Sequence, residues 1–206
     1  MKIHNFKFAT ILGIFLSFSL LGIDYLSAQT VWLDQLDLST ATQGYGIPMK
    51  NKSIDGKTLT IAGQTFERGF GSHSESSLTI LLEGKATLFT AQVGIDDEVK
   101  GQKPAAEFIV FGDNKKLWTS GVMSLGDAAK PCSVKLDGVK KLELVVNDGG
   151  NGNYYDHVDW VDAKFQTTGV TTFKTFSPVA TEPYILTSSG NRVVIFINVM
   201  LSIPRF

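Results

Sequence analysis

The sequence predicts an all-β protein, folded as an antiparallel two-sheet β-sandwich of the jelly-roll, galactose-binding-like type. Three stretches alternate apolar and polar residues with the period of two that is typical of half-buried strands: residues 77–82, 89–95 and 141–146. Turn sequences containing Gly, Asp or Asn separate such stretches, at residues 54–57, 62–64, 111–115 and 136–139. About nine short strands and no helical period favour two packed sheets, whose loops gather at the ends and edges.

The first 28 residues are predicted to be a secretory signal peptide. Lys2 and Lys7 give a positive start, residues 8–21 are apolar, and Ser27-Ala28 provides small residues for cleavage before Gln29. The apolar run is shorter than the roughly 20 residues that a spanning helix needs. This favours cleavage over the alternative of a retained anchor. We therefore expect a secreted, periplasmic or cell-surface protein without membrane contact after cleavage.

The composition changes after Phe165, so the sequence predicts a module over residues 29–166 and a linker with a truncated or irregular tail over residues 167–206. The segment 166–187 is rich in Thr, Ser and Pro, as linkers are. Residues 193–201 are apolar apart from Asn198 and have no evident partner strand. The interpretation is that a second domain has been lost by truncation or a changed reading frame. The alternative is an extra strand that docks on the sandwich.

Charge and cysteine content exclude some classes of partner. The chain has 19 basic and 20 acidic residues and a formal charge of -1, which gives no basic surface for nucleic acid. The single cysteine, Cys132, cannot form an internal disulfide, so the domain must be held by its core. A length of 206 residues suits one domain, and we expect a monomer.

The most informative stretch is residues 147–160, a loop rich in Gly and Asn that leads through two tyrosines into an apolar strand. Gly and Asn dominate this loop; they contribute little packing and favour left-handed turns. Amides, carboxylates, an imidazole and aromatic rings follow one another there. These groups suit a sugar, because polar side chains pair with hydroxyls while an aromatic ring contacts the apolar C–H face. The loop therefore predicts a shallow polar pocket with an aromatic wall.

Six segments together resemble the NPCBM family, whose members are carbohydrate-binding modules attached to many glycoside hydrolases. They are residues 32–37, 43–46, 69–74, 93–98, 120–124 and 155–163. The resemblance covers residues 31–165 and implies a β-sandwich that binds galactose-type sugars or related glycans in a loop pocket, with calcium as a structural ion. Residues 178–186 also look like the connector to an α-galactosidase catalytic domain. No such domain follows, which puts hydrolase activity in doubt.

The candidate carbohydrate-binding residues are Tyr45, His73, Glu75, Asp97, Asn153, Asp156, His157, Asp159 and Trp160. Tyr45 stands between two glycines, so its ring is expected to be exposed for stacking. Asp156 is the preferred direct contact, because a carboxylate can accept two hydroxyls. The carboxylates beside His157 are expected to orient its ring and favour its protonated form. For His73, the alternative is a turn histidine bonded to the backbone. For His157, it is a structural hydrogen-bond network that closes the loop. For Trp160, a core position is favoured, and a sugar-facing edge is the alternative.

The acidic residues are candidates for a calcium site and for a catalytic pair. The acidic cluster at residues 96–98 and Asp162 carry the oxygen ligands that calcium requires, although their spacing matches no EF-hand loop, and a solvated turn is the alternative for the cluster. Glycoside hydrolysis needs two carboxyl groups facing across a cleft, for which Asp97 and Asp156 would be the pair. Loops of this modest length would hardly enclose a substrate. We expect no enzyme activity, zinc site or nucleophile elbow.

The sequence thus favours a secreted, non-catalytic module that binds galactose-type glycans and targets an attached or partner glycoside hydrolase. Two alternatives stay open. The chain is either the N-terminal fragment of an α-galactosidase-type hydrolase without its catalytic domain, or a protein-binding adhesion module.

Overall fold

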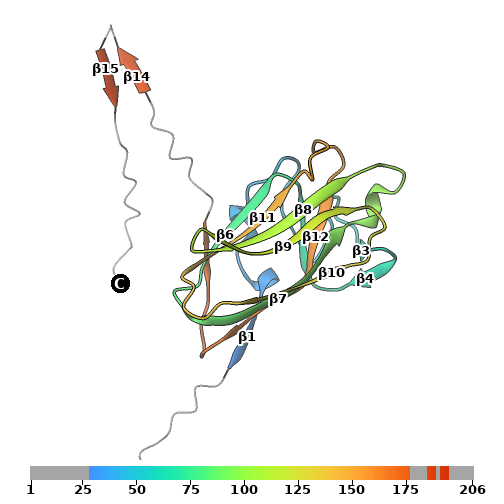
Figure 1. The fold of residues 1–206 in the computed structure, drawn as a ribbon, viewed down its shortest axis with the longest axis horizontal. Coiled ribbons are helices and arrows are strands. Elements are labelled where there is room, and N and C mark those ends of the chain that lie inside the picture. Colours follow the sequence, from blue (N-terminus) through green and yellow to red (C-terminus); the bar gives the residue numbers. More distant parts are fainter. Residues whose placement is uncertain (1–27, 177–184, 189–190, 195–206) are drawn as a thin grey trace, which may run out of the picture.

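Two antiparallel sheets packed face to face form the protein, as the sequence predicts (Figure 1). The computed structural model describes residues 28–176, 185–188 and 191–194. The first sheet has the order β10-β7-β12-β5-β2, with β1 also pairing with β12. Its strands are β1 Gln29–Trp32, β2 Met49–Lys50, β5 Gly69–His73, β7 Ala86–Ile95, β10 Lys130–Lys135 and β12 His157–Thr167.

The second sheet has the order β13-β6-β11-β8-β9. Its strands are β6 Ser76–Leu81, β8 Ala105–Gly112, β9 Lys115–Ser124, β11 Lys141–Asn147 and β13 Lys174–Phe176. A hairpin of β3 Leu59–Ile61 and β4 Gln64–Phe66 and three short 3-10 helices, η1 Leu33–Gln35, η2 Leu38–Thr40 and η3 Asp97–Val99, complete the sandwich. The described residues contain no helix that is long and apolar enough to cross a membrane.

The core lies between the two sheets and is built from the apolar positions that alternate along each strand. Leu78 and Ile80 of β6, and Leu142 and Leu144 of β11, are at most 2% exposed, as their alternation predicts. The largest fully buried side chains are aromatic: Trp160, Phe70, Phe89, Phe108 and Phe165. Each large apolar side chain contributes about 1.5–3 kcal/mol when it is fully buried. Cys132 lies in this core, and burial raises the pKa of its thiol to about 12, so it behaves as a small apolar residue.

Strand β12 contains a β-bulge and buries apolar residues on both of its faces. Its pairing with β7 shifts register between Val161 and Lys164, and Asp162 has a left-handed φ of 49°. The extra residue brings Trp160 before the bulge and Phe165 after it to the same core. Val161 faces the other side and packs against the β3–β4 hairpin. The sequence pattern allowed either a bulge or burial on both faces, and β12 has both.

The β3–β4 hairpin and the segment before it cover the outer face of the first sheet. This close approach requires glycine on the neighbouring strands. A Cβ on Gly71 of β5 would lie 2.1 Å from the carbonyl oxygen of Lys52, and one on Gly94 of β7 would lie 2.5 Å from Cγ2 of Ile61. The outer face of β5 and of the first half of β12 is therefore covered, up to the strand ends that carry His73 and His157.

The sandwich extends beyond the predicted boundary at residue 166. Phe173 is buried in the core, and β13 pairs with β6 at the edge of the second sheet. The additional edge strand is Lys174–Phe176, so part of the segment predicted as linker packs on the sandwich. The start of the apolar segment 193–201 does have a partner: β15 Asn191–Val194 pairs with β14 Ile185–Ser188. The predicted signal peptide lies outside the described residues except for Ala28.

Candidate sugar-binding site

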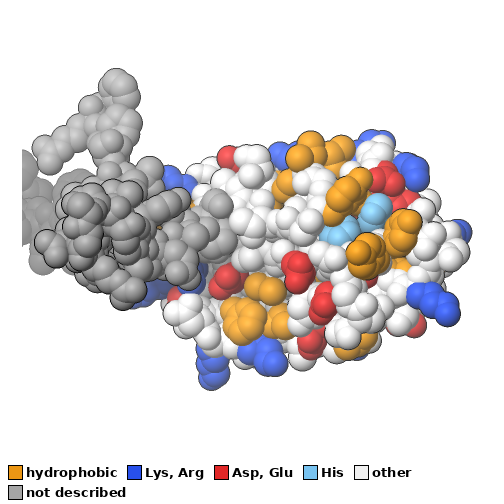
Figure 2. All heavy atoms as spheres, turned by 90° about the horizontal axis from the view of Figure 1, so that it is seen from above, with side chains coloured by type: hydrophobic (Ala, Val, Ile, Leu, Met, Phe, Trp, Pro, Cys, Tyr) orange, Lys and Arg blue, Asp and Glu red, His pale blue; other side chains and the backbone are white. Residues whose placement is uncertain are grey.

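A pocket of about 530 Å³ opens at one end of the sandwich. Five separate segments line it: the loop before β2, the turn that carries Asp55, the end of β5, the segment 98–102, and the loop 153–157 that enters β12. Figure 2 shows histidine side chains between apolar side chains on this face of the molecule. Strand ends and the loops between them thus build the pocket, which is the predicted location of the site.

Three aromatic rings form the centre of the pocket. His73 and His157 are cross-strand partners in β5 and β12, and their ring centroids are 5.6 Å apart. The Tyr45 ring lies 5.5 Å from the ring of His73 and 6.2 Å from that of His157, nearly parallel to the latter at 17°. The histidines are 3% and 7% exposed, whereas Tyr45 is 59% exposed. The predicted grouping of these three residues is therefore what the fold produces.

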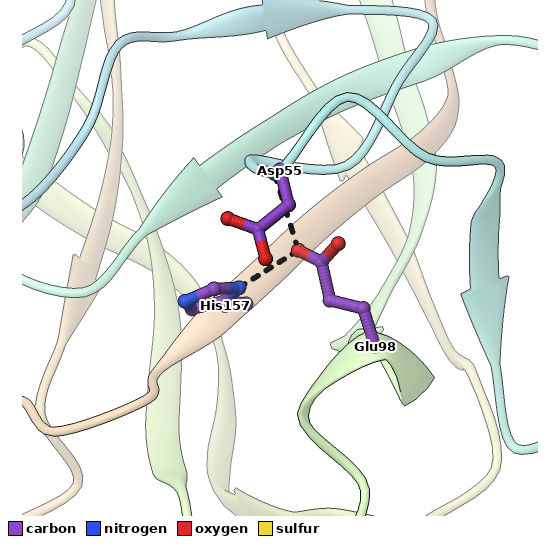
Figure 3. A group of neighbouring side chains, drawn as sticks. All are labelled: Asp55, Glu98 and His157. Carbon is purple, nitrogen blue, oxygen red and sulfur yellow. Dashed lines mark hydrogen bonds and ion pairs between the residues drawn. The ribbon is translucent and has the colours of Figure 1, made fainter.

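Glu98 fixes the ring of His157 (Figure 3). Nδ1 of His157 lies 2.7 Å from Oε1 of Glu98, and the Oγ of Ser53 donates to Oε2 of Glu98 at 2.6 Å. The Glu98 side chain is only 1% exposed, with the Lys57 ammonium 3.9 Å away. Because Nδ1 is engaged, the ring has Nε2 left for a ligand. The sequence predicted that the carboxylates beside His157 in the chain would orient it, but a carboxylate from a distant segment does so.

The 3-10 helix η3 explains why Glu98 and not Asp97 reaches the pocket. Asp96 caps this helix, and its Oδ1 accepts from the backbone N–H of Glu98 at 2.7 Å. Asp97 turns the other way, where it accepts from Gly63 N at 2.7 Å and pairs with Lys100 at 3.8 Å. The prediction that Asp97 lines the site is therefore wrong, and the neighbouring residue was missed. The acidic cluster was the correct signal, but the turn geometry selects its inward-facing member.

His73 presents a neutral ring. Its Nδ1 lies 3.3 Å from the carbonyl oxygen of Ser74, which can only accept, so this nitrogen carries the proton. Burial lowers the pKa of His73, and the hydrogen bond to Ser74 opposes this shift only in part. The remaining nitrogen, Nε2, is then an acceptor.

The rim of the pocket is formed by a tied loop. Asn153 lines the pocket, and its Nδ2 donates to Oε2 of Glu75 at 3.1 Å. Glu75 is exposed, does not itself line the pocket, and has a left-handed φ of 57°. Its role in this structure is to hold Asn153. Tyr154 and Tyr155 complete the rim, and sequence reasoning did not include them among the candidate residues.

Asp156 lies beneath the pocket instead of facing it. The residue is fully buried, and its Oδ1 accepts from Ala105 N at 3.0 Å. Burial raises the pKa of its carboxyl group, and the neighbouring Asp148 charge acts in the same direction. The prediction of a direct sugar contact is corrected: the loop backbone covers this side chain, which fastens the loop to the start of β8.

We expect replacement of Asp156 by Ala to destabilise the protein by about 1–3 kcal/mol, because the buried N–H of Ala105 would lose its acceptor. Asp156→Asn keeps an oxygen at the same place and serves as the matched control with a smaller loss. Chemical denaturation measures both. An Ala variant with unchanged stability and lost sugar binding would return Asp156 to the list of ligand contacts.

Asp159 and Trp160 are also removed from the set of residues that reach a ligand. Both are at most 1% exposed. Trp160 faces the core, where its ring meets Phe108 edge-on at 5.3 Å. Asp159 faces outward but is covered by the segment before and within the β3–β4 hairpin. The favoured core interpretation of Trp160 is thus the observed one, and neither Asp159 nor Trp160 lines the pocket.

The residues offered as calcium ligands do not converge on one point. Asp96 and Asp97 bond to the backbone of the β3–β4 region, and Asp162 lies in the bulge of β12. A different group, Asp55, Glu98 and His157, has ligand atoms that all lie within 4.8 Å of one another. One nitrogen and two carboxylates suit a transition metal better than calcium, which prefers six to eight oxygens. The four polar groups around Glu98 already satisfy it without an ion.

Similar solved structures include carbohydrate-binding modules. The CBM51 module of Clostridium perfringens GH95, in complex with methyl-galactose, is similar with a TM-score of 0.62 and 35% identity, covering 66% of this chain and 99% of that chain. The structure of CBM51-2 and INT domains of Clostridium perfringens ZmpB, in complex with GlcNAc, gives a TM-score of 0.63 and 32% identity, covering 68% of this chain and 32% of that chain.

Similar curated proteins are large enzymes. A Renibacterium salmoninarum protein named as an endo-alpha-N-acetylgalactosaminidase is 34% identical over 154 residues, which is 71% of this chain and 10% of the relative. The alpha-1,3-galactosidase B of Akkermansia muciniphila is 35% identical over 123 residues, or 58% of this chain and 15% of the relative. This chain therefore spans only a small part of their length. Residues 29–166 match the NPCBM/NEW2 domain, and the chain belongs to this family as a carbohydrate-binding module.

Proposed function

We propose that the pocket binds the terminal galactose-type unit of a glycan and that the module thereby keeps an attached or partner glycoside hydrolase near its substrate. The arrangement of Tyr45 beside His73 and His157 carries this proposal. An exposed aromatic ring offers a surface for the C–H face of a sugar, and the buried rings offer nitrogens for its hydroxyls.

The hydrogen-bonding roles follow from what each ring already contacts. Nδ1 of His73 donates to Ser74, and Nδ1 of His157 donates to Glu98. In the neutral form of each ring, Nε2 accepts a hydroxyl proton from the ligand. Two acceptors on adjacent strands suit two hydroxyls of one sugar ring. Glu98 is a positioning residue in this scheme, because it acts on the ligand through His157.

Support for a galactose-type ligand comes from the similar proteins. One similar module was solved with methyl-galactose, and both similar enzymes are named for galactose-type substrates. Another similar module was solved with GlcNAc, which makes this sugar the comparison ligand. Hydrogen bonds at an open site are worth about 0.5–1.5 kcal/mol each, so we expect micromolar to millimolar affinity.

We infer that the module itself is not catalytic. The carboxylates that line the pocket are Asp55 and Glu98, and both lie beside His157 instead of facing each other across a cleft. Catalysis would then belong to an attached or partner hydrolase. A role as the N-terminal fragment of an α-galactosidase-type enzyme is compatible with the small share of the relatives that this chain covers. Export and a monomeric state are further parts of the proposal.

Tyr45→Ala is the test of the site. We expect it to weaken methyl-galactoside binding about tenfold or more, because the C–H face of the sugar loses the ring against which it is buried. The free energy of unfolding should stay within about 0.5 kcal/mol of the original, because the side chain is exposed. Ile47→Ala is the matched control, since this residue is 69% exposed on the same loop but does not line the pocket. Titration calorimetry with methyl-galactoside and GlcNAc measures the affinities.

The proposal fails if the unmodified protein binds neither sugar, or if Tyr45→Ala and Ile47→Ala bind equally well. Absence of binding across a glycan array would favour the adhesion alternative, in which the ligand is a protein.

A further inference from the structure

We propose that the pocket continues into a second sugar subsite built by Tyr154 and Tyr155, so that the preferred ligand is the end of an oligosaccharide chain and not a single sugar. This inference rests on the proposed function and extends it. It assigns a task to two aromatic side chains that the first sugar, held by Tyr45 and the two histidines, does not require.

The exposure of these side chains is the first observation. Tyr154 is 83% exposed and Tyr155 is 51% exposed, and both line the pocket. Among the described residues, six large apolar side chains are exposed, and three of them, these two and Tyr45, border the same pocket. Clustered exposed aromatic rings around a concave polar site indicate a binding surface.

The second observation is that the loop carrying the tyrosines is tied on both sides. Nδ2 of Asn151 donates to the carbonyl oxygen of Lys103 at 3.1 Å, and Nδ2 of Asn153 donates to Glu75 at 3.1 Å. Asp156 accepts from Ala105 N through its side chain and from Ser74 N through its backbone, at 3.0 and 3.1 Å. The exposed rings therefore stand on a held backbone, and little chain entropy remains to be lost when a ligand binds.

Backbone strain at Tyr155 points the same way. Its φ of 62° is left-handed, a conformation that costs a residue with a side chain free energy and favours Gly or Asn. The N–H of His157 donates to the carbonyl oxygen of Tyr155 at 2.8 Å, so the strained turn leads directly into the residue at the centre of the pocket. A tyrosine kept in this conformation is consistent with a need for its ring at the rim.

The size of the pocket is the third observation. Its volume of about 530 Å³ falls in the range of about 300–1,000 Å³ that holds drug-sized ligands, and a single hexose is smaller than these. Gln102 also lines the pocket, in the segment to which Asn151 is bonded, and its amide can pair with hydroxyls of a second ring. A second pyranose beside the first would thus find aromatic faces and an amide.

Calorimetry on the purified protein tests this subsite by comparing methyl-galactoside with disaccharides that share a terminal galactose and differ in linkage and second sugar. We expect at least one disaccharide to bind about threefold to tenfold more tightly than methyl-galactoside. Tyr154→Ala and Tyr155→Asn should lower the affinity for the disaccharide more than that for methyl-galactoside, so that this gain disappears. Asn is chosen at position 155 because it tolerates the left-handed backbone.

Val122→Ala is the control for removal of an exposed apolar side chain, since this residue is 60% exposed on β9 and does not line the pocket. Equal affinity for methyl-galactoside and every disaccharide would overturn the second subsite while leaving the sugar-binding function intact. Tyrosine variants that lose both ligands to the same extent would overturn it as well, by placing the rings in the first subsite. If no sugar binds at all, the proposed function and this inference fail together.

Discussion

Trp160→Ala is expected to lower the free energy of unfolding by about 3–5 kcal/mol, the loss typical of a large aromatic side chain removed from a core. The ring is 1% exposed and lies 5.3 Å from Phe108 and 6.3 Å from Phe89, measured between centroids. It joins strand β12 of the first sheet to β8 of the second, so a cavity would open between the sheets. For a domain of this size, the melting temperature should fall by roughly 10 °C.

The matched comparison is Tyr45→Ala, which should show the opposite pattern, with lost sugar affinity and retained stability. Thermal denaturation measures the stability of each variant, and titration calorimetry below the melting transition measures its affinity for methyl-galactoside. A Trp160→Ala protein that melts like the original but no longer binds methyl-galactoside would contradict the core assignment and return this tryptophan to the sugar site.

Asp159→Asn is expected to stabilise the protein by about 1–3 kcal/mol at neutral pH, because the neutral amide removes a fully buried ionisable group that has no donor on either oxygen and lies near Asp96 and Glu98. The reason lies in the neighbouring strands. Asp159 pairs with Gly71 on β5 and Gly94 on β7, so no side chain on either strand can donate to it. Glycine is required at both positions by the segment that covers this face.

The pH dependence of this effect has a definite sign. Burial, together with the nearby charges of Asp96 and Glu98, raises the pKa of Asp159 well above its ordinary value of 3.8. Between 3.8 and the raised pKa, the folded state holds a proton that the unfolded state has released, so the free energy of unfolding falls as the pH rises. The Asn variant lacks this slope. Its advantage should therefore be small near pH 4 and should grow toward pH 8.

Melting temperatures across this pH range measure the difference, and Asp137→Asn is the surface control because Asp137 is exposed. A variant that is less stable than the original protein at every pH would show that the carboxylate has a charged partner. If that loss requires Ca²⁺ in the buffer, the calcium ion implied by the family resemblance would be assigned to this residue.

Much of the fold could be predicted because strand alternation is a local property of the chain. Leu78 and Ile80, or Leu142 and Leu144, repeat with a period of two, and each pair lies in the core as expected. The edge strand β13 could not be predicted in the same way. It has only three residues, too few to show an alternation, and pairing with β6 and burial of the preceding Phe173 attach it to the sandwich.

The structure brings only some of the candidate site residues together. Tyr45, His73, Asn153 and His157 line one pocket, whereas Asp97, Asp156, Asp159 and Trp160 do not. All eight lie near loop or strand ends in the sequence, and all eight are polar or aromatic. Neither position nor residue type therefore indicated which side chains would face the pocket. Which side chain faces a cavity depends on the neighbours that cover it, and these come from distant segments.

By itself, the sequence determined that this chain forms an antiparallel sandwich and that a loop rich in Gly, Asn and aromatic residues opens at its end, because alternation and turn preference act over a few residues. The tertiary structure decided which polar groups reach a ligand. The cap of η3 turns Glu98 inward, and the covering segment closes over Asp159. Both outcomes depend on contacts between segments that are far apart in the chain, and such contacts leave no local pattern.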